Sequence, residues 1–169
     1  MKGWDDLDFL DQLELVGKLL LAAFCGGLIG WQRDRRQYVA GLRTMALVAT
    51  GASLFVAANE VLGGDRVTAN IVTGVGFLGA GIIFREGGTV RGITTAATLW
   101  SVAAIGVAIG VELYLVALVA TPLVFLILEM GPLSEYLSGR RTHLPLPRGL
   151  RRSDGSADDE DEGRERSED

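Results

Sequence analysis

The sequence is poor in the residues that catalytic and metal sites use most. It holds one Cys, one His and four Pro among 169 residues. Cys25 lies in an apolar run and can form no intramolecular disulfide, and His143 lies outside that run, so no Cys-His or Ser-His-Asp site can form there. One Cys and one His are too few for a usual zinc site. Neither Lys2 nor Lys18 stands in a P-loop motif. We therefore expect no enzyme and no cofactor, with Mg²⁺ as the one ion left open.

Charge is concentrated at the ends of the chain, and its net value is −5. Residues 139–152 hold five Arg and no acid, whereas residues 153–169 hold nine acids and two Arg. We interpret residues 131–152 as a basic juxtamembrane linker, residues 153–169 as a disordered acidic tail, and residues 1–12 as a short acidic N-terminus outside the cytoplasm. Basic residues are not interleaved with aromatic ones, so no nucleic acid partner is expected.

Long apolar runs fill the middle of the chain. A helix needs about 20 apolar residues to cross the ~30 Å hydrocarbon core of a bilayer. Five runs approach or reach this length, and their expected bounds are 13–31, 42–62, 67–84, 93–110 and 113–130. The predicted fold is therefore an all-α integral membrane bundle of five transmembrane helices, residues 13–130, with the lipid bilayer as its first partner.

The loops between the apolar runs predict an orientation. Arg33, Arg35 and Arg36 follow the first run, Arg85 and Arg91 follow the third, and the basic linker follows the fifth. Basic loops remain in the cytoplasm. We therefore predict a multi-pass protein of the cell membrane, plasma or inner, with its N-terminus outside and its C-terminus in the cytoplasm.

The third run, residues 67–84, is rich in small residues. On helical spacing it has two mostly small faces, one with Ala69, Thr73, Gly76 and Ala80 and one with Asn70, Gly74, Phe77 and Gly81. Gly74, Gly76 and Gly79 match the dinucleotide fingerprint, but they follow no strand and no acid stands at the required distance. We predict instead that this run is the central packing helix of the bundle.

Two other runs carry pairs of glycines four residues apart, Gly26 with Gly30 and Gly106 with Gly110. This spacing lets helix backbones approach closely in membranes. Together with the small faces of residues 67–84, it makes a homodimer a reasonable expectation.

Polar residues within the apolar runs leave two interpretations open. Residues 42–62 and 93–110 each carry a stripe of hydroxyl side chains. In the first interpretation the stripes face inward and line a narrow polar seam. In the second, each hydroxyl donates to a backbone carbonyl of its own helix or bonds across helices. Asn70 is the most strongly polar group in its run and the leading candidate for an intramembrane role. If Mg²⁺ binds, Glu60 and Asn70 are the candidate ligands. The candidate functional polar residues are Asn70, Arg85, Glu86, Arg91, Thr95 and Thr98.

Several short strings stand in order between residues 13 and 130. They include Gly30-Trp31-Gln32-Arg33, Gly41-Leu42-Arg43-Thr44, residues 74–83 (GVGFLGAGII), Arg85-Glu86-Gly87, Val90-Arg91-Gly92 and residues 95–100 (TAATLW). In this order and spacing they resemble the MgtC/SapB family of bacterial and archaeal membrane proteins. The motif and packing positions carried by the resemblance are Gly30, Gly41, Arg43, Thr44, Gly74, Gly76, Gly79, Gly81 and Trp100.

The resemblance implies a polytopic membrane protein tied to magnesium homeostasis and, in some relatives, modulation of the F-type ATP synthase. The chain departs from the family at Gln32, where members usually have Glu, and at Ser101, where some have Cys. Many relatives add an ACT-like C-terminal domain, and we expect none here.

Two functional hypotheses follow. In the first, the chain is a non-enzymatic regulator whose small-residue faces pack on a partner, such as a membrane ATPase or ATP synthase, with residues 85–92 as a candidate docking loop. In the second, it is a transporter or channel for Mg²⁺ or another cation, which enters past Glu60 and Asn70 and follows the polar seam.

Overall fold

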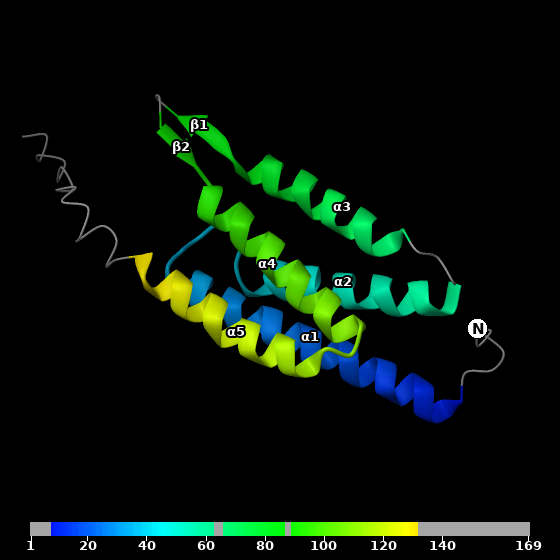
Figure 1. Ribbon diagram of the computed structural model, residues 1–169. Helices are drawn as coiled ribbons and strands as arrows, with labels where there is room; N and C mark the ends of the chain where they lie inside the picture. Colours follow the sequence, from blue (N-terminus) through cyan, green and yellow to red (C-terminus); the bar gives the residue numbers. More distant parts are fainter. Residues whose placement is uncertain (1–7, 63–65, 87–88, 132–169) are drawn as a thin grey trace, which may run out of the picture. The chain divides into compact units, whose positions relative to one another are not determined.

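A computed structural model describes residues 8–62, 66–86 and 89–131, and it confirms the helical fold (Figure 1). Within this part of the chain the elements, in order, are α1 (Phe9–Arg35), α2 (Leu42–Leu62), α3 (Val67–Ile82), β1 (Phe84–Glu86), β2 (Thr89–Arg91), α4 (Ile93–Gly110) and α5 (Tyr114–Glu129). The predicted linker and acidic tail lie outside the described residues.

Helix ends follow local chemistry. Asp8 caps the N-terminus of α1 through a capping box, in which its own backbone N–H donates to Asp11 Oδ2 at 3.3 Å. This box starts α1 four residues before the predicted bound at residue 13. At the start of α4, Gly92 has φ +90°, a left-handed conformation that glycine adopts without strain. A Cβ there would lie within 2.3 Å of the Ile82 carbonyl oxygen, so this position also requires a residue with no side chain.

The helices differ in length from the predicted spans. Of the described helices, three are long and apolar enough to cross a membrane, namely Phe9–Arg35, Leu42–Asn59 and Ile93–Gly110. The other two, α3 and α5, have 16 residues each. The third predicted span was too long at its C-terminal end. The backbone becomes extended at Ile83, with ψ 119°, and the chain then enters a short antiparallel hairpin of β1 and β2 that the sequence had presented only as a loop.

Consecutive helices run in opposite directions, as Figure 1 shows. The C-terminal end of α1, the hairpin, the start of α4 and the C-terminal end of α5 therefore lie at one end of the bundle. Since the Arg-bearing segments 33–43 and 85–91 belong to this end, we name it the arginine end. The C-terminal ends of α2 and α4 lie at the opposite end.

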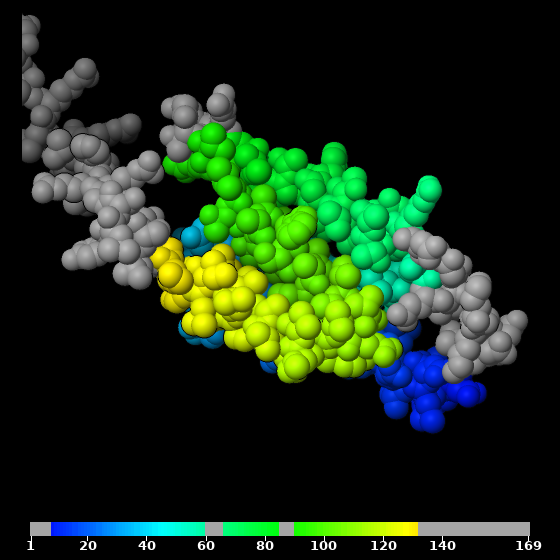
Figure 2. All heavy atoms as spheres, viewed as in Figure 1, coloured from blue at the N-terminus to red at the C-terminus, as the bar shows by residue number. Residues whose placement is uncertain are grey.

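The central helix is α4, and the prediction that residues 67–84 occupy the centre is wrong. Each of the other helices contacts α4, whereas α3 packs mainly on α4 and more sparsely on α2. Only Val75 and Gly79 are buried in α3, against nine residues in α4. Figure 2 shows α4 filling the space between α3 and α5 on one face of the bundle. Small residues made α3 suited to close packing, but within one copy most of them face outward.

Glycines bring α1, α2 and α4 into close contact. A Cβ at Gly30 would lie 2.5 Å from Leu42 Cα, and one at Gly106 would lie 2.2 Å from the Ala49 carbonyl oxygen. Gly26 and Gly110 meet α2 in the same way. The two GxxxG pairs therefore serve packing inside one copy. Around them lies the core of apolar side chains, which includes Ala22, Ile29, Met45, Ala49, Leu99 and Val102.

Candidate functional site

A buried arginine joins two helices at the arginine end. Arg33, in the last turn of α1, is only 1% exposed. Its Nη2 donates to the Thr95 hydroxyl at 2.5 Å, its Nη1 donates to the Thr98 hydroxyl at 3.2 Å, and its Nε donates to the Ala40 carbonyl at 3.1 Å. The guanidinium also lies over the Tyr38 ring, 4.3 Å from its centroid. A charged group so deeply buried needs such partners, because losing its hydration is costly.

No carboxylate among the described residues pairs with Arg33, whose described partners are neutral oxygens and one aromatic ring. The positive charge is therefore not cancelled by a described neighbour. It adds a fixed cation between α1 and α4, at the level of the two threonines.

The turn after α1 holds Arg33 in place. The backbone N–H groups of Arg36 and Tyr38 donate to the Arg33 carbonyl, at 3.1 and 3.2 Å, and Gln37 between them has the left-handed φ of 57°. This tight turn brings the Ala40 carbonyl and the Tyr38 ring back against the guanidinium.

Asp34 and Gly41 fix the following helix. Asp34 Oδ2 accepts the backbone N–H of Leu42 at 3.0 Å, which satisfies one of the free donors at the start of α2. Asp34 lies so close to Gly41 that a Cβ there would overlap its carboxylate. Gly30 and Gly41, predicted as packing residues, thus both lie at the α1–α2 turn. Arg43 and Thr44, from the same string, are exposed.

A second polar cluster ties α5 to α1. Gln32 Nε2 donates to Glu129 Oε2 at 2.5 Å and to the Phe125 carbonyl at 3.2 Å, and Arg36 pairs with Glu129 Oε1 at 2.6 Å. Gln32 is buried, and its Oε1 has no described partner. Gln32 therefore acts as a donor to a carboxylate, a bond that an ionised Glu could not make.

The opposite end of the bundle carries one ion-pair cluster among the described residues. Lys18 Nζ lies 2.8 Å from Glu112 Oε1 and 3.1 Å from Glu14 Oε1. Lys18 is 8% exposed, so it is buried and paired. It therefore links α1 to the loop between α4 and α5.

The predicted polar residues do not form one site. Thr95 and Thr98 meet at Arg33, whereas Asn70 is exposed on α3 in a separate groove. Arg91 and Trp100 are exposed. The side chains of Glu60, Arg85 and Glu86 lie outside what the structure describes, so the docking loop and the metal hypothesis at Glu60 stay predictions. Among the described residues, no group of three His, Cys, Asp or Glu could hold a metal ion.

Three stripe hydroxyls follow the local interpretation, whereas the buried Ser53 Oγ has no hydrogen-bond partner among the described residues. Thr50, Thr98 and Ser101 each donate to the carbonyl four residues earlier, at 2.8, 2.7 and 2.9 Å. Thr94 is exposed. Of the stripe in residues 93–110, Thr98 accepts a hydrogen bond from Arg33, as does the neighbouring Thr95.

The glycines of α3 have different surroundings. Gly79 packs on Ala96 of α4, where an added Cβ would lie 3.4 Å from the alanine Cβ. At Gly74, Gly76 and Gly81 an added Cβ would meet no atom within 4 Å. These three glycines face open space in one copy, so any close packing they provide would involve another molecule.

The sequence predicts Arg33 in a basic loop, whereas the structure buries it in the last turn of α1. The sequence feature that indicates its burial is its position on the helix. Arg33 continues the buried face formed by Ala22, Gly26 and Ile29 at intervals of three and four residues. Arg35, two positions on, points elsewhere and lies over the Trp31 ring at 3.9 Å.

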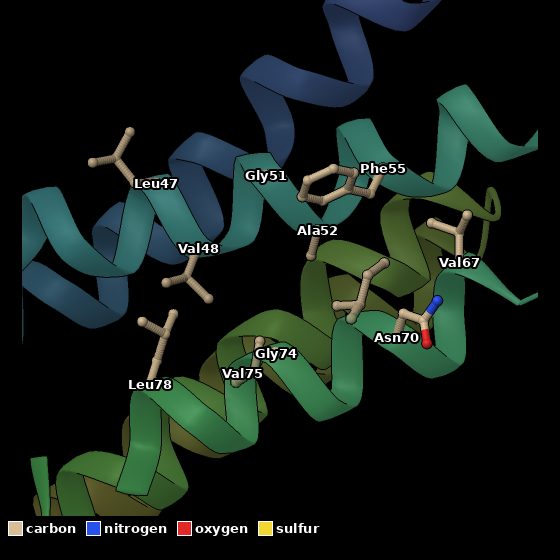
Figure 3. Close-up of a pocket in the computed structure, with 11 residues that line it drawn as sticks. Leu47, Val48, Gly51, Ala52, Phe55, Val67, Asn70, Gly74, Val75 and Leu78 are labelled. Atoms are coloured by element: carbon tan, nitrogen blue, oxygen red, sulfur yellow. The ribbon is translucent and has the colours of Figure 1, made fainter. Parts of the chain in front are cut away.

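An apolar groove of about 650 Å³ separates α2 from α3 (Figure 3). Its walls include Leu47, Gly51 and Phe55 of α2 and Gly74 and Leu78 of α3. Among the described residues, Asn70 is the one polar side chain that lines it.

Comparison with known proteins gives one family. The model of the MgtC family matches residues 19–136. Protein MgtC of Brucella abortus (strain 2308) is 55% identical over 111 residues, which cover 63% of this chain and 45% of that protein. Protein MgtC of Salmonella typhimurium (strain 14028s / SGSC 2262) is 52% identical over 131 residues, which cover 76% of this chain and 55% of that protein. The chain thus spans about half the length of these curated relatives, and no solved structure matches it.

Proposed function

Because this chain belongs to the MgtC family, we propose that it is a non-enzymatic membrane regulator that acts in magnesium homeostasis by packing on a protein partner. The partner class that we propose is a membrane-embedded ATPase, such as the F-type ATP synthase. The family membership and the apolar helices make the chain a membrane protein. The regulatory role is the part that we add.

The observation that carries the proposal is the position of the Arg33 guanidinium. It bonds to Thr98, a hydroxyl of the predicted polar seam, and to the neighbouring Thr95. A fixed positive charge there repels a passing Mg²⁺ ion, because buried charges are poorly screened. One copy of the chain is therefore better suited to a packing role than to conducting cations.

A surface for the partner is offered by α3. An added Cβ at Gly76 would meet no atom within 4 Å, and the residues on the same face, Ala69, Thr73 and Ala80, are small and exposed. A helix of another protein can approach such a face closely, which is how helices associate in lipid.

We also infer the orientation. Arg33, Arg35, Arg36, Arg43 and Arg91 all belong to the arginine end. With this end in the cytoplasm, the N-terminus lies outside an inner or plasma membrane and the C-terminus lies inside. Accessibility labelling of single cysteines introduced at residues 37 and 112 in a Cys25→Ala background, in intact cells, tests this assignment. The opposite labelling pattern would reverse it.

The decisive functional experiment pairs growth with flux. In cells that lack their own MgtC-family gene and grow on limiting magnesium, the chain should restore growth, and Gly76→Leu should abolish the rescue by blocking the partner face. Gly17→Leu is the matched control, since Gly17 also faces open space but lies on α1.

Purified protein in liposomes should carry neither Mg²⁺ nor protons above the level of empty liposomes. Flux that is lost in Asn70→Ala would instead make the chain a transporter, and full rescue by Gly76→Leu would remove the packing surface.

A further inference from the structure

We propose that the groove between α2 and α3 binds one phospholipid, with one of its two acyl chains along the groove and its phosphate at Arg66 and Asn70. The inference does not depend on the regulatory role, because it concerns a different surface from the open Gly76 face and its test measures lipid alone.

The size of the groove fits this occupant. Its volume of about 650 Å³ falls in the range of about 300–1,000 Å³ that is typical of small-molecule sites. Its residues on α3 run from Val67 to Leu78, which is about 16 Å of helix at 1.5 Å rise per residue. One leaflet of a bilayer contributes about half of its ~30 Å hydrocarbon core. The groove is therefore about one leaflet deep.

The lining is graded from one end to the other. Leu47, Val48 and Leu78 line the end that lies toward the C-terminus of α3 with purely apolar side chains, as Figure 3 shows. Asn70 lies at the other end, close to Val67 and the start of α3. Gly51 and Gly74 face each other across the gap without side chains to fill it. An apolar trough with one polar end matches the amphipathic pattern of a lipid.

Charge complementarity selects a phosphate for the polar end. Arg66 immediately precedes α3 and is exposed, and its carbonyl accepts the Asn70 N–H at 3.1 Å, so the two residues stand one helical turn apart. No side chain caps the start of α3, and no acid lies in its first turn. Arg66, the Asn70 amide and the positive end of the helix dipole thus all favour an anionic oxygen.

A second copy of this chain fits the groove less well. The groove ends at Leu78, whereas α3 continues to Ile82. We expect a docking helix to contact the whole length of α3. The small-residue face suited to a helix, with Ala69, Gly76 and Ala80, does not line the groove. We therefore assign the groove to lipid.

The test is native mass spectrometry of the full chain in detergent titrated with phosphatidylglycerol. Wild type should retain one lipid per copy. Gly74→Leu fills the groove from α3 without meeting other atoms and should lower the bound fraction at least about tenfold, a difference of about 1.4 kcal/mol. Gly51→Leu does the same from α2. Gly76→Leu is the matched control, an identical change on α3 outside the groove, and it should bind as wild type does.

The headgroup assignment has its own variants. Arg66→Gln should weaken binding of phosphatidylglycerol about fivefold, the effect of one basic contact near a membrane surface. Diacylglycerol, which has no phosphate, should bind more weakly to wild type and be insensitive to this change. Equal binding of both lipids, with no effect of Arg66→Gln, would overturn the assignment of the phosphate.

Two further results would overturn the groove itself. The first is unchanged lipid binding by both Gly74→Leu and Gly51→Leu. The second is a lipid-free wild-type dimer that Gly74→Leu dissociates, which would give the groove to a second copy. Either result leaves the growth and flux experiments untouched, so a failure here is distinguishable from a failure of the regulatory role.

Discussion

Arg33 Nη2 donates to the Thr95 hydroxyl across 2.5 Å, and the two residues are 62 positions apart in the sequence. This contact fastens the last turn of α1 to the first turn of α4, the helix that every other helix contacts. A buried charge thereby sets how the two helices meet at the arginine end.

Removing the Arg33 side chain should destabilise the bundle strongly. Arg33→Ala leaves the Ala40 carbonyl without its donor, removes the Thr95 and Thr98 contacts and opens a cavity. We expect a loss of about 3 kcal/mol in the free energy of unfolding. Unfolding in mixed detergent micelles, followed by circular dichroism, measures it. The control is Arg35→Ala, which loses an exposed contact with Trp31 and should cost about 1 kcal/mol or less. Equal losses in the two variants would contradict the role of burial.

Close contact at Gly106 should make even one methyl group costly. A Cβ there would lie 2.2 Å from the Ala49 carbonyl oxygen, so Gly106→Ala must push α4 away from α2 and should cost about 1–3 kcal/mol. Gly81→Ala is the counterpart on an open surface and should be neutral or stabilising by up to about 1 kcal/mol through helix propensity. Thermal unfolding in detergent distinguishes the two. A destabilised Gly81→Ala with an intact Gly106→Ala would reverse the packing assignment.

Glu129 should hold the end of α5 against α1. Glu129→Ala removes the acceptor of both Gln32 and Arg36, so the last turn of α5 should fray. Hydrogen exchange followed by mass spectrometry should show faster exchange over residues 126–130. Glu112→Ala, at the other end of the bundle, should leave these amides unchanged. If the amides of residues 126–130 exchange at the same rate in the two variants, the hydrogen bonds of Glu129 do not order the last turn of α5.

The Lys18 cluster should contribute modestly, because Glu112 and Glu14 are more than half exposed. A double-mutant cycle of Lys18→Gln and Glu112→Gln should give a coupling free energy of about 0.2–1 kcal/mol that falls as salt is added. A coupling that salt does not reduce would mean that the pair is shielded from solvent.

The sequence by itself determined the helices and the end at which the arginines gather. Runs of apolar residues set the number of helices, since an apolar helix of about 20 residues satisfies its own backbone in lipid. Their alternation with Arg-bearing loops sets which ends lie together, because short connections force neighbouring helices to run antiparallel. The strings that resemble the MgtC/SapB family come from the same stretch, residues 13–130, and the family match confirms them.

Only the tertiary structure decided which helix is central and which arginine is buried. Residues 67–84 and 93–110 are both rich in small residues, and composition alone does not say whether a glycine meets a neighbour. Gly106 meets Ala49, whereas Gly76 meets nothing. Arg33 and Arg35 have identical chemistry, yet they differ by two positions on a helix and so point to different sides. Burial depends on which helices approach those sides, and that follows from the packing of the whole bundle.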